Sequence, residues 1–125
     1  MVIVDSDILI WLLRGDESVK ARFKELAGDL DGEMYITPIQ IAEVRAGMKD
    51  RERRKTEELL DAFPVQEIDA AVGAGAGDIL RRYAPSHGAT LADALIAGTA
   101  IYHRMKLWTL NKKHYPGMED DDCIA

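Results

Sequence analysis

The feature that most constrains the fold is the alternation of short apolar runs with longer helical patterns. The first run, Val2-Ile3-Val4, is β-branched at every position, which is typical of a strand buried on both faces of a parallel sheet. Comparable runs, each separated from the one before by helical periodicity, occur at residues 34–36, 64–68 and 107–110. Strands that alternate with helices predict an α/β fold with a mainly parallel central sheet flanked by helices.

Capping residues mark where the predicted helices begin. Thr37, Pro38 and Gln40 together form the sequence of a capping box with proline at the first helical position. Further caps are predicted at Asp16, Asp69 and Thr90, and a loop is predicted at residues 85–88. After Asp16, apolar residues repeat on one helix face at Val19, Phe23, Leu26 and Leu30.

The length of 125 residues predicts a single domain over residues 1–125, with an acidic C-terminal tail at 118–125. Cys123 is the only cysteine, so no disulfide can form within the chain and a reducing compartment is expected. The opening MVIVD lacks the features of a signal peptide. No apolar run reaches the roughly 18 residues that span a membrane. We therefore expect a cytoplasmic protein that makes no membrane contact.

The net charge of −6 argues at first against a polyanionic partner, but the charge is unevenly distributed. Four acids lie in the tail at residues 119–122. Basic residues gather in two stretches, 45–55 and 101–115, and these follow Glu43 and Asp93 in the chain. Glu43 and Asp93 are thus each followed in the chain by a stretch of basic residues.

Four oxygen-bearing side chains are predicted at the carboxyl ends of strands or early in the following helices: Asp5, Glu43, Asp93 and Asn111. In an open α/β sheet, these positions gather at one edge. Ligand sets made only of oxygen select hard cations, and Mg²⁺ or Mn²⁺ is held by one or two carboxylates with several waters. The hydroxyls of Ser6 and Thr109 are placed to order such a site.

Each of these residues also has a purely structural interpretation. Asp5 can cap the helix that follows it, and Asp93 is favoured by the dipole of its own helix. Asn111 fits a turn. Glu43 stands among apolar neighbours, where a carboxylate needs a partner, and Arg45 or Arg104 can supply one.

Four segments in series resemble a known family: VDSDILIWLLRG (4–15), TPIQIAEVRAGM (37–48), LADALIAGTA (91–100) and WTLNKKHYPGM (108–118). Their order and spacing resemble those of PIN-domain ribonucleases of the VapC toxin type. The resemblance implies that Asp5, Glu43 and Asp93 bind metal and that Ser6 and Thr109 order the site. Asn111 stands where the family often has a fourth acid, which puts its role as a direct ligand in question.

The chemistry implied by the resemblance is cleavage of RNA by water, dependent on one or two ions of Mg²⁺ or Mn²⁺. The substrate class would be structured RNA, either tRNA or ribosomal RNA. The resemblance also implies a homodimer and a small antitoxin that covers the site. Contacts with RNA phosphates are expected from Arg45, Lys49, Arg51, Lys112 and Lys113.

Three other interpretations stay open at this point. A receiver-type phosphoacceptor domain has this length, but the residues after Lys112-Lys113 and around Asp69 do not fit its pattern. Asp5-Ser6-Asp7 is similar to the start of haloacid-dehalogenase-like phosphatases, although no later acidic pair follows a predicted strand. A PIN-like domain that binds RNA or protein without cleaving is favoured only by Asn111.

Overall fold

The computed structural model describes residues 1–29 and 33–125 and contains a four-stranded sheet. Its strand order is β2-β1-β3-β4, and all neighbouring strands are parallel. The strands are β1 (Val2–Val4), β2 (Met34–Tyr35), β3 (Lys106–Trp108) and β4 (Cys123–Ile124). β1 lies in the interior of the sheet, with Ile3 opposite Tyr35 on one side and Leu107 on the other. The α/β fold with a parallel sheet is therefore confirmed.

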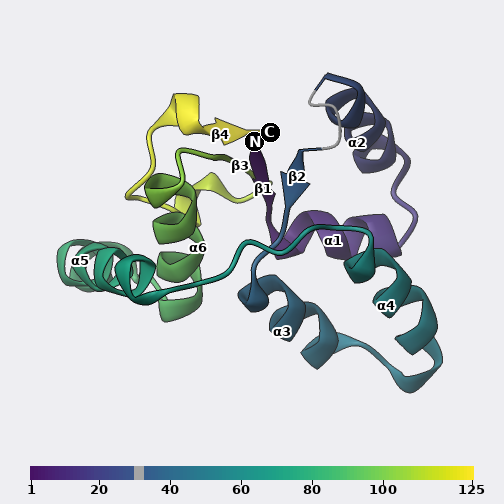
Figure 1. Cartoon of the computed structure of the whole chain (residues 1–125), viewed down its shortest axis with the longest axis horizontal. Helices are drawn as coiled ribbons and strands as arrows, with labels where there is room; N and C mark the ends of the chain where they lie inside the picture. The colour runs from purple at the N-terminus through teal and green to yellow at the C-terminus, as the bar shows by residue number, and fades with distance from the viewer. Residues whose placement is uncertain (30–32) are drawn as a thin grey trace.

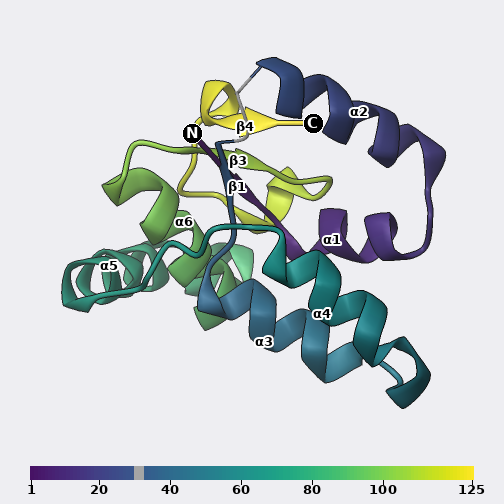
Figure 2. The ribbon, with the colours of Figure 1, turned by 45° about the vertical axis from the view of Figure 1, so that its right-hand side comes forward.

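Helices cover both faces of the sheet (Figures 1 and 2), with α5 and α6 on one side and α1, α2 and α4 on the other. The helices are α1 (Ser6–Leu13), α2 (Glu17–Asp29), α3 (Pro38–Gly47), α4 (Arg53–Asp61), α5 (Ala70–His87) and α6 (Leu91–Tyr102). Short 3₁₀ turns occur at η1 (Asp50–Glu52), η2 (Lys112–His114) and η3 (Asp120–Asp122). None of the helices in the described ranges is long and apolar enough to cross a membrane.

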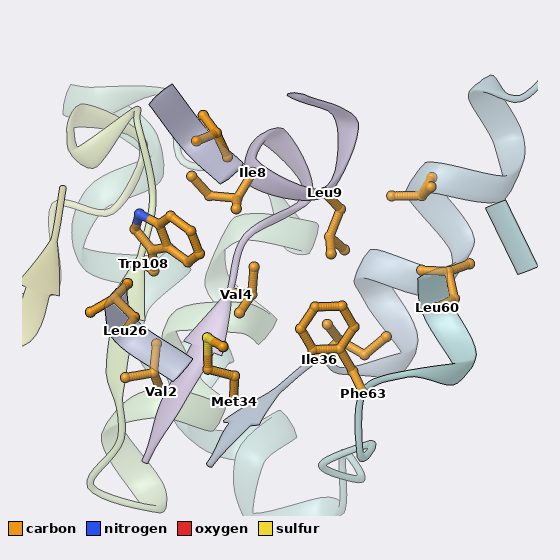
Figure 3. Close-up of a cluster of buried hydrophobic side chains, with 12 residues drawn as sticks. Val2, Val4, Ile8, Leu9, Leu26, Met34, Ile36, Leu60, Phe63 and Trp108 are labelled. Carbon is orange, nitrogen blue, oxygen red and sulfur yellow. The ribbon is translucent and has the colours of Figure 1, made fainter. Parts of the chain in front are cut away.

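The alternation of side chains along β1 divides the core into two clusters. Val2 and Val4 face the cluster formed with α1, α2, α3 and α4, which Figure 3 shows around Trp108 and Phe63. Ile3 faces the opposite cluster, built mainly from α6 and the residues around β3. Because both faces are covered, β1 is apolar at every position, as its sequence predicted.

The predicted helix starts are confirmed by their hydrogen bonds. Thr37 accepts from the Ile39 amide, and Gln40 completes the capping box. Asp16, Asp69 and Thr90 each accept a hydrogen bond from the backbone amide three residues later. Of the apolar face predicted after Asp16, Leu30 lies outside the described residues.

Two predictions about the middle of the chain are wrong. Residues 64–68 form no strand, because only Val65 pairs, by one parallel bridge to Ile36 at an open edge, and Pro64 has no amide to donate. Residues 85–88 are not a loop, since α5 runs on to His87 through Pro85. The helix ends instead at Gly88, whose φ of 63° is the left-handed conformation that glycine adopts most readily.

The C-terminal segment is also more ordered than an acidic tail would suggest. After η3, Cys123 and Ile124 form β4 and pair with Leu107 and Trp108 of β3. Ile124 packs against the larger core cluster, so this short apolar pair anchors the acidic residues that precede it.

A close approach of two helices requires glycine on α6. An added Cβ on Gly98 would lie 3.2 Å from the Val72 carbonyl oxygen of α5. This contact sets how closely α6 packs against α5.

Candidate functional site

The Asp5 carboxylate lies at the carboxyl end of β1 and accepts three hydrogen bonds. Oδ1 accepts from the Ser6 amide at 2.7 Å, which caps α1. Oδ2 accepts from the Thr109 hydroxyl at 2.7 Å and from the Tyr115 hydroxyl at 2.8 Å. Capping therefore accounts for only one of the two carboxylate oxygens, and the other lies among side chains that are more than 100 residues away in the chain.

The pKa of Asp5 is raised to about 6, mainly by burial and also by the nearby Asp7 charge, while the three donated hydrogen bonds partly oppose the rise. Only 7% of Asp5 is exposed. Sites that bind cations or move protons commonly contain a buried carboxylate whose pKa is raised.

Asp7 ties the start of α1 to the loop that follows β3. Its Oδ2 accepts from the Leu110 amide at 3.0 Å and from the Asn111 side-chain Nδ2 at 2.9 Å. The backbone N–H of Asn111 in turn donates to the Thr109 hydroxyl at 3.0 Å. This network fixes Thr109 and Asn111 beside Asp5, and because Asn111 uses its nitrogen for Asp7, its side-chain oxygen is the atom available to a ligand.

Glu43 lies on α3 and is linked to the same site through Ser6, whose hydroxyl donates to Glu43 Oε1 at 2.7 Å. The expectation of a carboxylate enclosed by apolar neighbours is wrong, because Glu43 is exposed on the helix surface. It pairs with neither of the arginines considered from the sequence, since Arg45 binds Glu57 instead, at 3.1 Å.

Asp93 is half-buried in the first turn of α6, where its amide donates to the Thr90 cap. The negative charge of Asp93 acts on the Tyr115 hydroxyl, which donates to Asp5. Burial is the main cause of a raised pKa at the Tyr115 hydroxyl, followed by the charge of Asp5 and the hydrogen bond to it, and then by the charge of Asp93. Asp93 thus adds negative potential to the side of the site that lies against α6.

The structure brings the predicted site residues together to different degrees. Asp5, Ser6, Thr109 and Asn111 are joined by hydrogen bonds, with Glu43 attached through Ser6. Over residues 1–29 and 33–125, no three acidic, histidine or cysteine side chains lie close enough to hold a metal ion between them. In the same ranges, no lysine or arginine forms an ion pair with any acid of the site.

The predicted RNA-binding residues fall into two groups. Arg45 and Lys112 are engaged by acids, Glu57 and Asp120 respectively. Lys49, Arg51 and Lys113 are exposed and form no ion pair with the described part of the chain. Only this second group is free to contact phosphate without first breaking an ion pair.

Sequence reasoning missed two residues of the site. The sequence assigns no site role to Asp7 beyond the Asp5-Ser6-Asp7 run, and it does not point to Tyr115. Tyr115 is in the core, with 2% exposed, but its hydroxyl is directed at Asp5. The position of Asp7 two residues after Asp5 was the one available signal for its role.

Comparison with known proteins identifies the family of the chain. Residues 2–115 match the family described as the PIN domain. Ribonuclease VapC10 of Mycobacterium tuberculosis is 42% identical over 120 residues, which are 95% of this chain and 89% of the relative. Ribonuclease VapC19 of the same organism is 29% identical over 121 residues, 96% of both chains.

Solved structures show the same fold. A toxin-antitoxin complex from Klebsiella pneumoniae superposes with a TM-score of 0.82 at 24% identity, covering 100% of this chain and 97% of the other. FitAcB from Neisseria gonorrhoeae superposes with a TM-score of 0.73 at 27% identity, covering 92% and 91%. With the family match and the identity to VapC10, these findings show that the chain belongs to the PIN-domain family, among its VapC-type ribonuclease toxins.

Proposed function

We propose that this chain cleaves RNA phosphodiester bonds by a water molecule, in a reaction that depends on a divalent metal ion held by Asp5, Glu43 and Asp93. The observation that carries the proposal is the Asp5 carboxylate. It is buried, it receives three hydrogen bonds, and no cationic side chain in the described ranges neutralises it.

The donor set fits a hard divalent cation. A carboxylate has about four lone-pair positions, so three donated hydrogen bonds leave Asp5 one position for a metal. Mg²⁺ typically takes one or two carboxylates and keeps several waters, so Glu43 and Asp93 need not converge on the ion as closely as in an all-protein cage. A cation would also stabilise the ionised form of Asp5, which burial and, after it, the Asp7 charge disfavour.

The side chains around Asp5 would each orient one part of this site. Thr109 and Tyr115 hold Asp5 Oδ2, and Ser6 holds Glu43 Oε1. Asp7 accepts a hydrogen bond from the side-chain nitrogen of Asn111, which leaves the side-chain oxygen of Asn111 as an acceptor for a ligand. A bound divalent ion supplies the chemistry by lowering the pKa of water and stabilising charge on the scissile phosphate. Hence no side-chain nucleophile is required.

The substrate we propose is structured RNA of the tRNA or ribosomal class. Lys49 and Arg51 follow α3, which carries Glu43, and Lys113 follows Asn111. These exposed cations follow two of the site residues in the chain, and they would bind phosphates of the RNA while the scissile phosphate lies at the acidic centre. Arg45 and Lys112 would contribute after exchanging a carboxylate for a phosphate.

The partners we propose are a small antitoxin that covers the acidic site and a second copy of this chain. The solved structure from Klebsiella pneumoniae is described as a toxin-antitoxin complex, which supports a protein partner of this kind. A negatively charged site without a cation would bind an arginine side chain well.

The test is cleavage of a labelled pool of structured RNA with Mg²⁺, with Mn²⁺ and with chelator. Asp93→Ala is prepared identically to detect contaminating nuclease, and Asp61→Ala, which removes an exposed acid of α4, is the matched control. We expect metal-dependent cutting by the wild type and by Asp61→Ala, and none by Asp93→Ala. Equal cutting by all three proteins, or RNA binding without cutting, would refute the proposed catalytic role.

A further inference from the structure

Gln40 is a fully buried polar residue on α3 that bonds to two separate parts of the chain. Its Nε2 donates to the Val4 carbonyl at 3.0 Å. Its Oε1 accepts from the Thr37 amide at 3.0 Å and from the Thr37 hydroxyl. The capping box accounts for the bonds to Thr37 but not for the bond to Val4, which lies 36 residues earlier on the strand that precedes Asp5.

The Gln40 amide occupies the place where the next rung between β1 and β2 would form. The ladder ends with the pair Ile3–Tyr35, and Ile36 turns its backbone toward Pro64 and Gln66 on the other side. Thr37 N–H and Val4 C=O therefore face each other across the end of the ladder. Instead of bonding directly, they bond to the two ends of one side-chain amide, which separates the start of α3 from β1.

This separation sets the place of Glu43 relative to Asp5. Gln40 and Glu43 are three residues apart on α3 and so share one helix face. Gln40 binds residue 4 and Glu43 is bound by residue 6, so the two contacts lie on either side of Asp5. Since α3 is a rigid element, the reach of the Gln40 side chain fixes the spacing between the two carboxylates.

We propose that Gln40 is a positioning residue of the metal site, which holds α3 at the distance from β1 that lets Asp5 and Glu43 bind one cation together. The proposal rests on the proposed function. Gln40 touches neither metal nor substrate, and it acts through the Val4 carbonyl and the start of α3. Groups that orient metal ligands in this way commonly contribute about ten- to hundredfold in metal affinity.

The experiment measures Mn²⁺ binding to metal-free protein by electron paramagnetic resonance of the free ion. Gln40→Met keeps the length of the side chain and removes its hydrogen bonds. Gln40→Asn keeps the amide but shortens its reach by one methylene, and it retains a polar group for Val4 or Thr37, so it tests the proposal if Gln40→Met does not fold. Val72→Ala, in a fully buried position of α5, is the control for lost stability.

We expect the Mn²⁺ dissociation constant to rise about tenfold in both Gln40 variants, and to stay within about twofold of wild type in Val72→Ala. We also expect saturating Mn²⁺ to restore RNA cleavage by the Gln40 variants, since all the carboxylates remain. Unchanged affinity in folded Gln40 variants, or an equal loss in Val72→Ala, would overturn the positioning role. Absence of Mn²⁺ binding by the wild type would instead contradict the proposed function itself.

Discussion

Replacing Asp5 by asparagine removes the ionisable group of the site while keeping its shape. In the folded chain, burial and the Asp7 charge raise the pKa of Asp5 to about 6, from an ordinary value of 3.8. A raised pKa means that folding favours the protonated form. The stability contributed by Asp5 is therefore fully present below about pH 3.8 and is lost as the pH rises through about 6.

The magnitude follows from the difference between the two pKa values. At about 1.4 kcal/mol per pH unit, the difference between 3.8 and about 6 corresponds to about 3 kcal/mol. About 2 kcal/mol of this change falls between roughly pH 4.5 and pH 7.5. Asp5→Asn has no carboxyl group to ionise at this position. Its free energy of unfolding should therefore rise relative to that of the wild type by about 2 kcal/mol over this pH range.

The assay is urea unfolding in the presence of chelator, followed by the fluorescence of Trp11 and Trp108, of which Trp108 is 1% exposed. The free energy of unfolding is measured at several pH values for wild type, Asp5→Asn and Asp61→Asn, in which an exposed carboxylate of α4 is neutralised. We expect the difference between Asp5→Asn and wild type to grow with pH, and the Asp61→Asn difference to stay flat. A constant difference for Asp5→Asn would refute the argument that the Asp5 carboxylate is destabilised by burial.

Three further substitutions test individual contacts. Tyr115→Phe removes a hydrogen bond to a charged group and should lower the free energy of unfolding at pH 8 by about 2 kcal/mol, with a smaller loss at pH 4.5, as measured by the same urea assay. Asn111→Asp replaces a donor to Asp7 by a like charge, so it should destabilise the metal-free protein by about 1–2 kcal/mol while increasing its thermal stabilisation by Mg²⁺; a smaller Mg²⁺ effect than in wild type would contradict this. Arg104 has a φ of 56° at the end of α6, so Arg104→Gly should raise the free energy of unfolding by about 0.5 kcal/mol, whereas Arg104→Ala, which keeps the strained backbone, should not.

The parts of the fold that could be predicted are those governed by neighbouring residues. The capping box at Thr37 and the apolar alternation of β1 depend on contacts within a few positions, so the sequence shows them directly. The limits of α5 could not be predicted from Pro85, because a proline in the last turn of a helix can be tolerated when a glycine just beyond it provides the stop.

The residues of the candidate site likewise divide into those that local sequence predicts and those that it does not. Asp5 and Asn111 were identified because each follows a strand, which is a local property. The bonds from Tyr115 to Asp5 and from Gln40 to Val4 join residues 110 and 36 positions apart, and no local pattern reports them. A buried polar side chain shows its partner only when the tertiary structure is known, which is why the role of Gln40 came from its contacts.

The order of the strands also determines when the site can form during synthesis. β1 is made first, but one of its two neighbours in the sheet is β3, which begins at residue 106. Thr109 and Tyr115 follow β3, so Asp5 lacks both side-chain donors until residues 104 and 110 positions further along have been made. Contacts that join such distant segments carry a large entropic cost of loop closure and are expected late in folding. A nascent chain on the ribosome therefore carries the Asp5 carboxylate without these two donors until β3 and the segment that follows it have been made.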